Sequence, residues 1–264
     1  MRGVATLENI GRRTHAALAE LGYLMALLAE SLYWVVAGIR RRQPVRLSPV
    51  FEQTMQVGVG AAGIATVLSF AVGVMLAIQG IHTLKIFGAE SQVVIGIALA
   101  VTREFSPLII GILVAGRSGS ALAARIGTMT VSQEVDALRV IGVEPVRYLV
   151  SPVLLAMLLM MPVLTLLADF AGLFGGAVFS AVAMDMSYSA YFSRCAEVLE
   201  VNDVMQGLAK SLVFAVIITL VGAANGFQVQ GGAEGVGKAT TRSVVQAITW
   251  IVLADMVFTF FLNR

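Results

Sequence analysis

The chain has 264 residues, of which 58% are hydrophobic and only 13% are charged, and its mean hydropathy is +0.88. Soluble globular domains carry about 25% charged residues, so this composition excludes an ordinary soluble domain and predicts a polytopic membrane protein. The net charge of +2 comes without the basic patch that nucleic-acid binding requires, and the single cysteine, Cys195, excludes an internal disulfide.

Residues 1–50 contain two groups of arginines around an apolar segment, LAELGYLMALLAESLYWVVAGI. Under the positive-inside rule this segment stays cytoplasmic. Glu20 and Glu30 interrupt the apolar run, and a crossing would leave one basic group outside, so we expect an interfacial helix and keep a crossing helix as the alternative. The apolar run starts late and lacks a small-residue cleavage site, which argues against a signal peptide. The arginines are Arg2, Arg12, Arg13, Arg40, Arg41, Arg42 and Arg46.

The first two membrane spans are expected at about 54–79 and 92–122, because both segments are apolar and long enough to cross. Residues 81–91 should form a short external loop. His82 in that loop lacks a nearby His, Cys or acidic cluster, so it is expected to be solvated rather than a metal ligand. Positive-inside topology returns the second span to the cytoplasm, where several arginines follow.

Two charged residues, Arg103 and Glu104, lie a third to half of the way through the second span. A charge at membrane depth costs about 2.5–3.5 kcal/mol unless it is paired or wetted, so both are functional candidates. Adjacent helical residues point about 100° apart, so the two cannot pair within their helix. The alternative is a buried pair with Lys210 or Asp169 that ties helices together. Glu104 shares its predicted helix face with Ile97, Ala100, Val101, Pro107 and Leu108, a lining that suits an apolar tail beside a polar head.

A short amphipathic helix is predicted at about 130–142, after a run of small residues that favours close helix packing. Thr130 and Gln133 have the spacing of a capping box, and Gly142 followed by Pro145 predicts a stop. About ten helical residues cover only about 15 Å, half of a bilayer core, so this helix must lie outside the membrane. Val131, Val135 and Leu138 form its apolar stripe, and Glu134, Asp136 and Arg139 are displayed to solvent.

Three further spans are expected in the second half of the chain. Residues 150–184 are too few for two spans and a turn, and Pro162 lies among them, so they predict one tilted, kinked helix. The acidic segment 185–203 should be external, and the fourth span, about 204–227, carries Lys210 near its outer end, where it could snorkel. A glycine-rich cytoplasmic loop at 228–242 then precedes a fifth span, about 243–262, which ends outside. We expect Asp169 and Asp255 to serve structure.

The sequence GAEGVGKA in that loop almost matches a Walker A motif. The match fails because Ala239 stands where a hydroxyl must reach magnesium, and no strand precedes it. We therefore predict no nucleotide site, no metal site and no enzymatic activity in this chain.

The block EFSPLIIGILVAGRSGSALAARIGTMTVSQEVDALRVIGVEPVRYLVSP, with GVGKATTRSVV and Asp255 further on, closely resembles the signature of the MlaE-type (YrbE-type) ABC-transporter permeases. These are membrane subunits of Gram-negative lipid-asymmetry systems. The resemblance runs from about residue 47 to the end. Two positions depart from it: Arg125 stands where many members have an acidic residue, and Val153 where many have a basic one.

The resemblance implies an all-α permease domain at 51–264, which follows the N-terminal interfacial helix expected at 1–50. It implies a permease that moves phospholipid between the inner membrane and periplasmic carriers, maintaining outer-membrane asymmetry. The alternation of basic and acidic loops places the N-terminus in the cytoplasm and the C-terminus in the periplasm. The implied partners are a second permease copy, an ABC ATPase that binds the ATP, a periplasmic MCE-domain hexamer and often a STAS-domain protein. The substrate-binding residues would be Arg103, Glu104, Lys210, Ile97 and Leu108, and the ATPase-coupling residues Gln133, Glu134, Asp136 and Arg139.

Two other functions stay open at this point. A proton-driven secondary transporter could use Glu104, Asp169 and Asp255, although an odd number of spans without an internal repeat argues against it. A membrane anchor for a periplasmic complex is the third reading.

Overall fold

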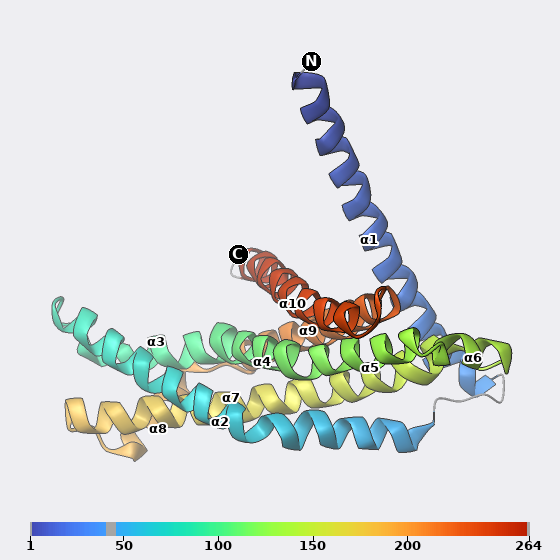
Figure 1. Cartoon of the computed structure of the whole chain (residues 1–264). Coiled ribbons are helices and arrows are strands. Elements are labelled where there is room, and N and C mark those ends of the chain that lie inside the picture. The colour runs from blue at the N-terminus through green and yellow to red at the C-terminus, as the bar shows by residue number, and fades with distance from the viewer. Residues whose placement is uncertain (1, 41–45, 263–264) are drawn as a thin grey trace.

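The structure is a computed structural model that describes residues 2–40 and 46–262, and every regular element in those residues is helical (Figure 1). Arg41 and Arg42 of the second basic group, and the chain's last two residues, lie outside this range. The α-helices are α1 (Arg2–Arg40), α2 (Leu47–Lys85), α3 (Val93–Ala100), α4 (Ser106–Val114), α5 (Ser120–Val131), α6 (Glu134–Val140), α7 (Ser151–Met184), α8 (Tyr188–Val198), α9 (Val201–Phe227) and α10 (Gly232–Leu262). A 3₁₀ turn, Glu90–Gln92, precedes α3, and π-helical turns at Val101–Phe105 and Ala115–Gly119 join α3, α4 and α5 into one continuous helix; a third π turn, Val146–Val150, leads into α7.

The prediction of an all-α polytopic membrane protein is confirmed. Six helices in the described residues are long and apolar enough to cross a membrane, by length and composition alone. Five of them contain the five predicted spans. The sixth, Leu18–Ala37, lies in α1, the helix that the sequence placed in the membrane interface.

Two predicted loops are wrong, because helices occupy much of them. Helix α2 continues to Lys85, so His82 lies in its last turn. Helix α10 begins at Gly232, so the glycine-rich segment forms its first turns instead of a free connector. Gly235 permits this, since a Cβ there would lie 1.9 Å from the Gln230 carbonyl oxygen, and an ion pair between Lys238 and Glu234 spans one turn at 2.6 Å.

Helix α7 is a single helix with Pro162 inside it, as predicted. It crosses α2 at very close range. A Cβ on Gly73 would lie 1.9 Å from the Gly172 carbonyl oxygen, and one on Gly175 would lie 2.2 Å from the Phe70 carbonyl oxygen. Small residues that let backbones touch are a main source of helix association in membranes, where burial of apolar surface contributes little.

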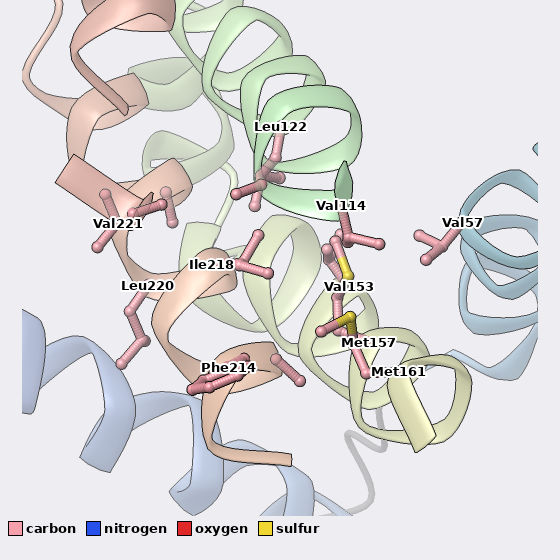
Figure 2. Packing of buried hydrophobic residues seen from close by; sticks show 14 of the residues in the cluster. Val57, Val114, Leu122, Val153, Met157, Met161, Phe214, Ile218, Leu220 and Val221 are labelled. Atoms are coloured by element: carbon pink, nitrogen blue, oxygen red, sulfur yellow. The ribbon is translucent and has the colours of Figure 1, made fainter. Parts of the chain in front are cut away.

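The main core joins α2, α4, α5, α7 and α9. Figure 2 shows side chains from these helices converging, among them Val57, Val114, Leu122, Met157 and Ile218, all of which are buried. The predicted small-residue run takes part in this packing, because a Cβ on Gly222 of α9 would lie 3.0 Å from the Gly119 carbonyl oxygen.

Helices α6 and α8 lie at opposite ends of the bundle (Figure 1). Helix α6 shares its end with the first turns of α2, and α8 packs near the start of α3 at the other end. The structure therefore separates two polar ends, which we call the α6 end and the α8 end.

Candidate functional site

The second long helix is interrupted at Val101–Phe105, the π-helical turn that carries Arg103 and Glu104. A cause lies in the sequence: Pro107 has no amide proton, so it cannot donate the ordinary helical bond to the carbonyl of Arg103. Thr102 adds a second perturbation, because its hydroxyl donates to the Ala98 carbonyl at 2.5 Å. Single π turns inside α-helices occur frequently at functional sites.

Glu104 belongs to a charged cluster that joins three helices. Lys210 Nζ of α9 donates to Glu104 Oε2 at 2.5 Å and to Thr259 Oγ1 at 3.1 Å, and it lies 2.9 Å from Asp255 Oδ1 in an ion pair without hydrogen-bond geometry. The Thr259 hydroxyl of α10 lies 3.0 and 3.1 Å from the two Glu104 oxygens. The Lys210 side chain is 1% exposed and that of Glu104 is 31% exposed. A buried ammonium thus meets two carboxylates.

Arg103 makes a separate ion pair beside this cluster. Its Nη2 lies 2.6 Å from Asp203 Oδ1, and its Nε donates to the same oxygen at 2.8 Å. The other oxygen of Asp203 accepts from the Glu200 amide at 2.9 Å, so this carboxylate also caps α9. Asp203 is 2% exposed, whereas Arg103 is 33% exposed. The sequence reasoning placed Asp203 in an external segment and missed this partner; the capping spacing from Glu200 to Asp203 was the available signal.

These contacts correct several expectations. Lys210 does not snorkel to the interface, because it is buried between carboxylates. Of the two alternative partners for Arg103 and Glu104, Lys210 pairs with Glu104 at 2.5 Å. Asp169 pairs with neither in the described residues: it is 6% exposed, and its Oδ1 has no hydrogen-bond partner. Asp255, expected to serve structure, is part of the cluster.

The two apolar residues predicted to bind substrate lie in different parts of the core. Ile97 is buried in a separate core beside Gly176 and Tyr191, and Leu108 packs against the main core. The π turn lies between these two residues and rotates one half of the helix relative to the other. An ideal helical face therefore does not describe this segment.

At the α6 end, the predicted short helix exists but starts later than expected, at Glu134. The predicted capping box is wrong. The Thr130 hydroxyl donates to the Ile126 carbonyl at 2.8 Å, and Gln133 adopts a left-handed conformation with φ +61°. Helix α5 thus runs through to Val131 and a tight bend follows, which leaves Val131 exposed.

The exposed face of α6 is charged. Glu134, Asp136 and Arg139 face solvent, with Asp136 and Arg139 paired at 3.0 Å, while buried Val135 anchors the helix to the bundle. Gly142, at φ +77°, ends this segment as predicted.

Comparison with known proteins gives the family. The family model described as "Permease MlaE" matches residues 50–261, most of the chain. The chain belongs to the MlaE permease family. A "Probable ABC transporter permease protein" of Rickettsia bellii is 32% identical over 252 residues, covering 96% of this chain and 95% of the relative.

Other relatives support the same assignment. A "Probable ABC transporter permease protein" of Synechocystis is 37% identical over 80% of this chain and 79% of its own length. The Arabidopsis thaliana chloroplastic protein named Trigalactosyldiacylglycerol 1 is 36% identical over 80% of this chain and 60% of its own length. The chain is therefore an ABC transporter permease, a multi-pass membrane subunit without catalytic activity, and a separate ATPase subunit hydrolyses the ATP.

Proposed function

We propose that this permease moves phospholipid, taking it between the inner membrane of a Gram-negative cell and periplasmic carriers, and so maintains outer-membrane lipid asymmetry. The observation that carries the proposal is the cluster of Glu104, Lys210 and Asp255 beside the pair of Arg103 and Asp203. Five ionisable residues at one level of an apolar bundle form a polar patch that a lipid headgroup can use while its chains contact the apolar helices. A relative whose printed name contains a galactolipid supports a lipid as the cargo.

The five residues differ in exposure, and this difference supports different proposed roles for them. Arg103 and Glu104 are about one-third exposed and can touch a headgroup, whereas Lys210 is buried and acts by holding Glu104. With two cations and three carboxylates, the five residues carry one net negative charge when all are ionised. A zwitterionic headgroup fits this arrangement, with its phosphate at Arg103 and its ammonium at Glu104.

The test compares Glu104→Gln with the unchanged transporter, reconstituted with its ATPase and supplied with labelled phosphatidylethanolamine. Glutamine keeps a hydrogen-bond acceptor for Lys210 but removes the charge. We expect normal insertion and assembly, about tenfold slower ATP-driven transport and less co-purified lipid. Normal transport together with unchanged lipid occupancy would contradict the proposal.

The short helix α6 is proposed to enter a groove of the ATPase subunit and couple hydrolysis to transport. Its support is a buried anchor at Val135 and exposed charges at Glu134, Asp136 and Arg139, with Gln133 at the bend. Replacing Glu134 and Asp136 together by Lys should detach the ATPase or uncouple hydrolysis while the permease still inserts. A double variant with normal coupling would reject this assignment.

The α6 end is proposed to face the cytoplasm and the α8 end the periplasm, with α1 in the cytoplasmic interface and the chain ending in the periplasm. Single cysteines at exposed Ile141 and Phe87, in a Cys195→Ser background, should then label from opposite sides in intact cells. Labelling of both from one side would reject this orientation.

The remaining proposed partners are a second permease copy, an MCE-domain hexamer at the α8 end and a STAS-domain protein at the α6 end. Helix α10 supports the second copy, because it leaves large apolar side chains exposed along its length, including Val252, Met256 and Phe260. Purification of the complex in mild detergent, with mass measurement of the intact assembly, tests the stoichiometry.

Proton-driven transport is the second candidate, because Asp169 is buried in the bundle with an oxygen that lacks a hydrogen-bond partner. Loss of transport on ATP depletion, with insensitivity to an uncoupler, would exclude it.

A further inference from the structure

A largely apolar cavity with two arginines in its lining lies near the α6 end, away from the charged cluster. It has a volume of about 590 Å³ and is bounded by the first half of α2, the end of the second long helix and the start of α7. Buried apolar residues form its floor, and exposed Met55 and Val59 extend its apolar wall along α2. The floor residues are Val57, Leu122, Val153 and Met157.

Two arginines line this cavity, Arg117 and Arg125. Among the described residues neither forms an ion pair with a carboxylate, and the hydrogen bond that Arg117 makes goes from Nη1 to the Gln56 carbonyl at 3.1 Å. The Arg117 guanidinium lies flat on Gly60, where any Cβ would collide with it. The backbone of α2 thus makes room for a cation that its side chains do not neutralise.

The surrounding polar groups fit an anion. Gln53 and Gln56 line the same cavity and carry amide groups that can donate. Glu52 is the acidic neighbour on α2; it is exposed to solvent, attracts Arg125 electrostatically without forming an ion pair, and accepts from the Gln56 amide at 3.4 Å. Two arginines and one carboxylate leave one net positive charge, the complement of a phosphodiester, and guanidinium groups bind phosphate oxygens through paired hydrogen bonds.

We propose that this cavity binds one anionic phospholipid of the adjacent leaflet, with its phosphodiester between Arg117 and Arg125 and an acyl chain along Met55 and Val59. On the orientation proposed above, this is the cytoplasmic leaflet. The site differs from the transport site, since Arg117 lies fourteen residues beyond Arg103 on the same continuous helix, about 21 Å along its axis. The bound lipid anchors the permease to the leaflet and is not its cargo.

The test uses the full transporter complex, stripped of lipid in detergent and titrated with short-chain phosphatidylglycerol, with bound lipid counted by native mass spectrometry. The double variant Arg117→Gln and Arg125→Gln should weaken the tightest phosphatidylglycerol binding by about tenfold or more, because each basic residue contributes several-fold. The matched control is Lys238→Gln, whose exposed side chain pairs with Glu234 away from the cavity. It should bind phosphatidylglycerol as the unchanged complex does.

Three further comparisons decide the source and the independence of the site. Phosphatidylethanolamine at equal concentration should compete poorly, and inorganic phosphate should not compete, because it lacks acyl chains. Equal competition by inorganic phosphate would overturn a lipid site in favour of a phosphate site. Glu104→Gln should slow transport about tenfold yet retain this phosphatidylglycerol, so failure of the transport proposal and failure of this one give different results.

Two outcomes would overturn the inference directly. One is unchanged phosphatidylglycerol binding in the folded, fully assembled double variant. The other is loss of the ATPase subunit from that variant with lipid binding intact, which would make the arginines a protein contact.

Discussion

The two polar regions along the second long helix handle charge in opposite ways. Around the π turn at Val101–Phe105, each cation is matched: Lys210 has Glu104 and Asp255, and Arg103 has Asp203. Around Arg117 and Arg125, the facing helices contribute glutamine amides, glycine and apolar side chains, and Glu52 attracts Arg125 from the solvent side, but no ion pair forms within the described residues. The charges of the first region are paired within the protein, whereas those of the second lack an ion-pair partner in the described residues.

The difference shows that one helix of a membrane protein can carry charges in two kinds of environment. A charge deep in the bundle must be paired internally, because hydrocarbon offers nothing to replace water. A charge near the membrane surface can rely on water or on lipid phosphates, so the protein need not provide a counter-ion. Three variants break or sharpen this contrast, and a labelling experiment tests the packing at the α8 end.

The largest effect is expected for Lys210→Met, which leaves Glu104 and Asp255 facing each other without a cation. Removing one partner of a buried ion pair typically costs about 3–5 kcal/mol. Thermal unfolding in detergent should show this loss, and adding Glu104→Gln with Asp255→Asn should recover part of it. If Lys210→Met unfolds at the unchanged temperature, the cluster contributes no stability.

A smaller loss is expected for Asp203→Asn, which keeps an acceptor for the Glu200 amide but removes the charge that faces Arg103. Arg103 is one-third exposed, so water screens the pair and the cost should be about 1–2 kcal/mol. The matched control is Asp136→Asn in the exposed pair with Arg139, where the change should stay within about 0.5 kcal/mol. Equal effects of the two variants would erase the contrast between buried and surface pairs.

In the second region, Gly60→Ala should move the Arg117 guanidinium without changing any charge, because a Cβ there would lie 2.0 Å from Nη2. The side chain is flexible, so stability should fall by less than about 1 kcal/mol while retained phosphatidylglycerol decreases. Gly63→Ala on the same helix has nothing within 4 Å and serves as control. If Gly60→Ala retained as much phosphatidylglycerol as the control, the position of Arg117 would not determine lipid binding.

The smallest effect concerns the α8 end, where the reactivity of Cys195 reports how tightly α8 is packed. Burial raises the pKa of this thiol to about 11, against a partial opposing effect of the hydrogen bond with Tyr191. At pH 7 only about one thiol in ten thousand is then ionised, so maleimide labelling should be slow. The labelling rate should rise about tenfold per pH unit towards pH 10. For a cysteine introduced at exposed Ile141, in a Cys195→Ser background, the labelling rate should approach its maximum near pH 9. Fast labelling of Cys195 at pH 7 would show that α8 opens.

Sequence reasoning identified charged residues inside the spans, and Lys210 as a possible partner of one of them, but not their other partners. Arg103, Glu104 and Lys210 stood out because a charge inside a long apolar run is costly wherever the helix packs. The sequence could not identify Asp203 and Asp255 as partners, since both lie at least 99 positions from Arg103 and Glu104 along the chain. Only packing of α9 and α10 against the π turn brings them within ion-pair distance.

By itself, the sequence determined that this protein is a helical, multi-pass permease of the MlaE type, because hydrophobic length and local motifs are properties of contiguous residues. The tertiary structure alone decided where helices begin and which charges are satisfied. It extended α2 and α10 into segments that looked like loops, moved the start of α6 to Glu134, and set the faces on either side of the π turn. The two helix extensions and the start of α6 depend on contacts between distant helices, whose energies outweigh the local preferences of glycine and threonine, whereas the π turn also has a local cause in Pro107.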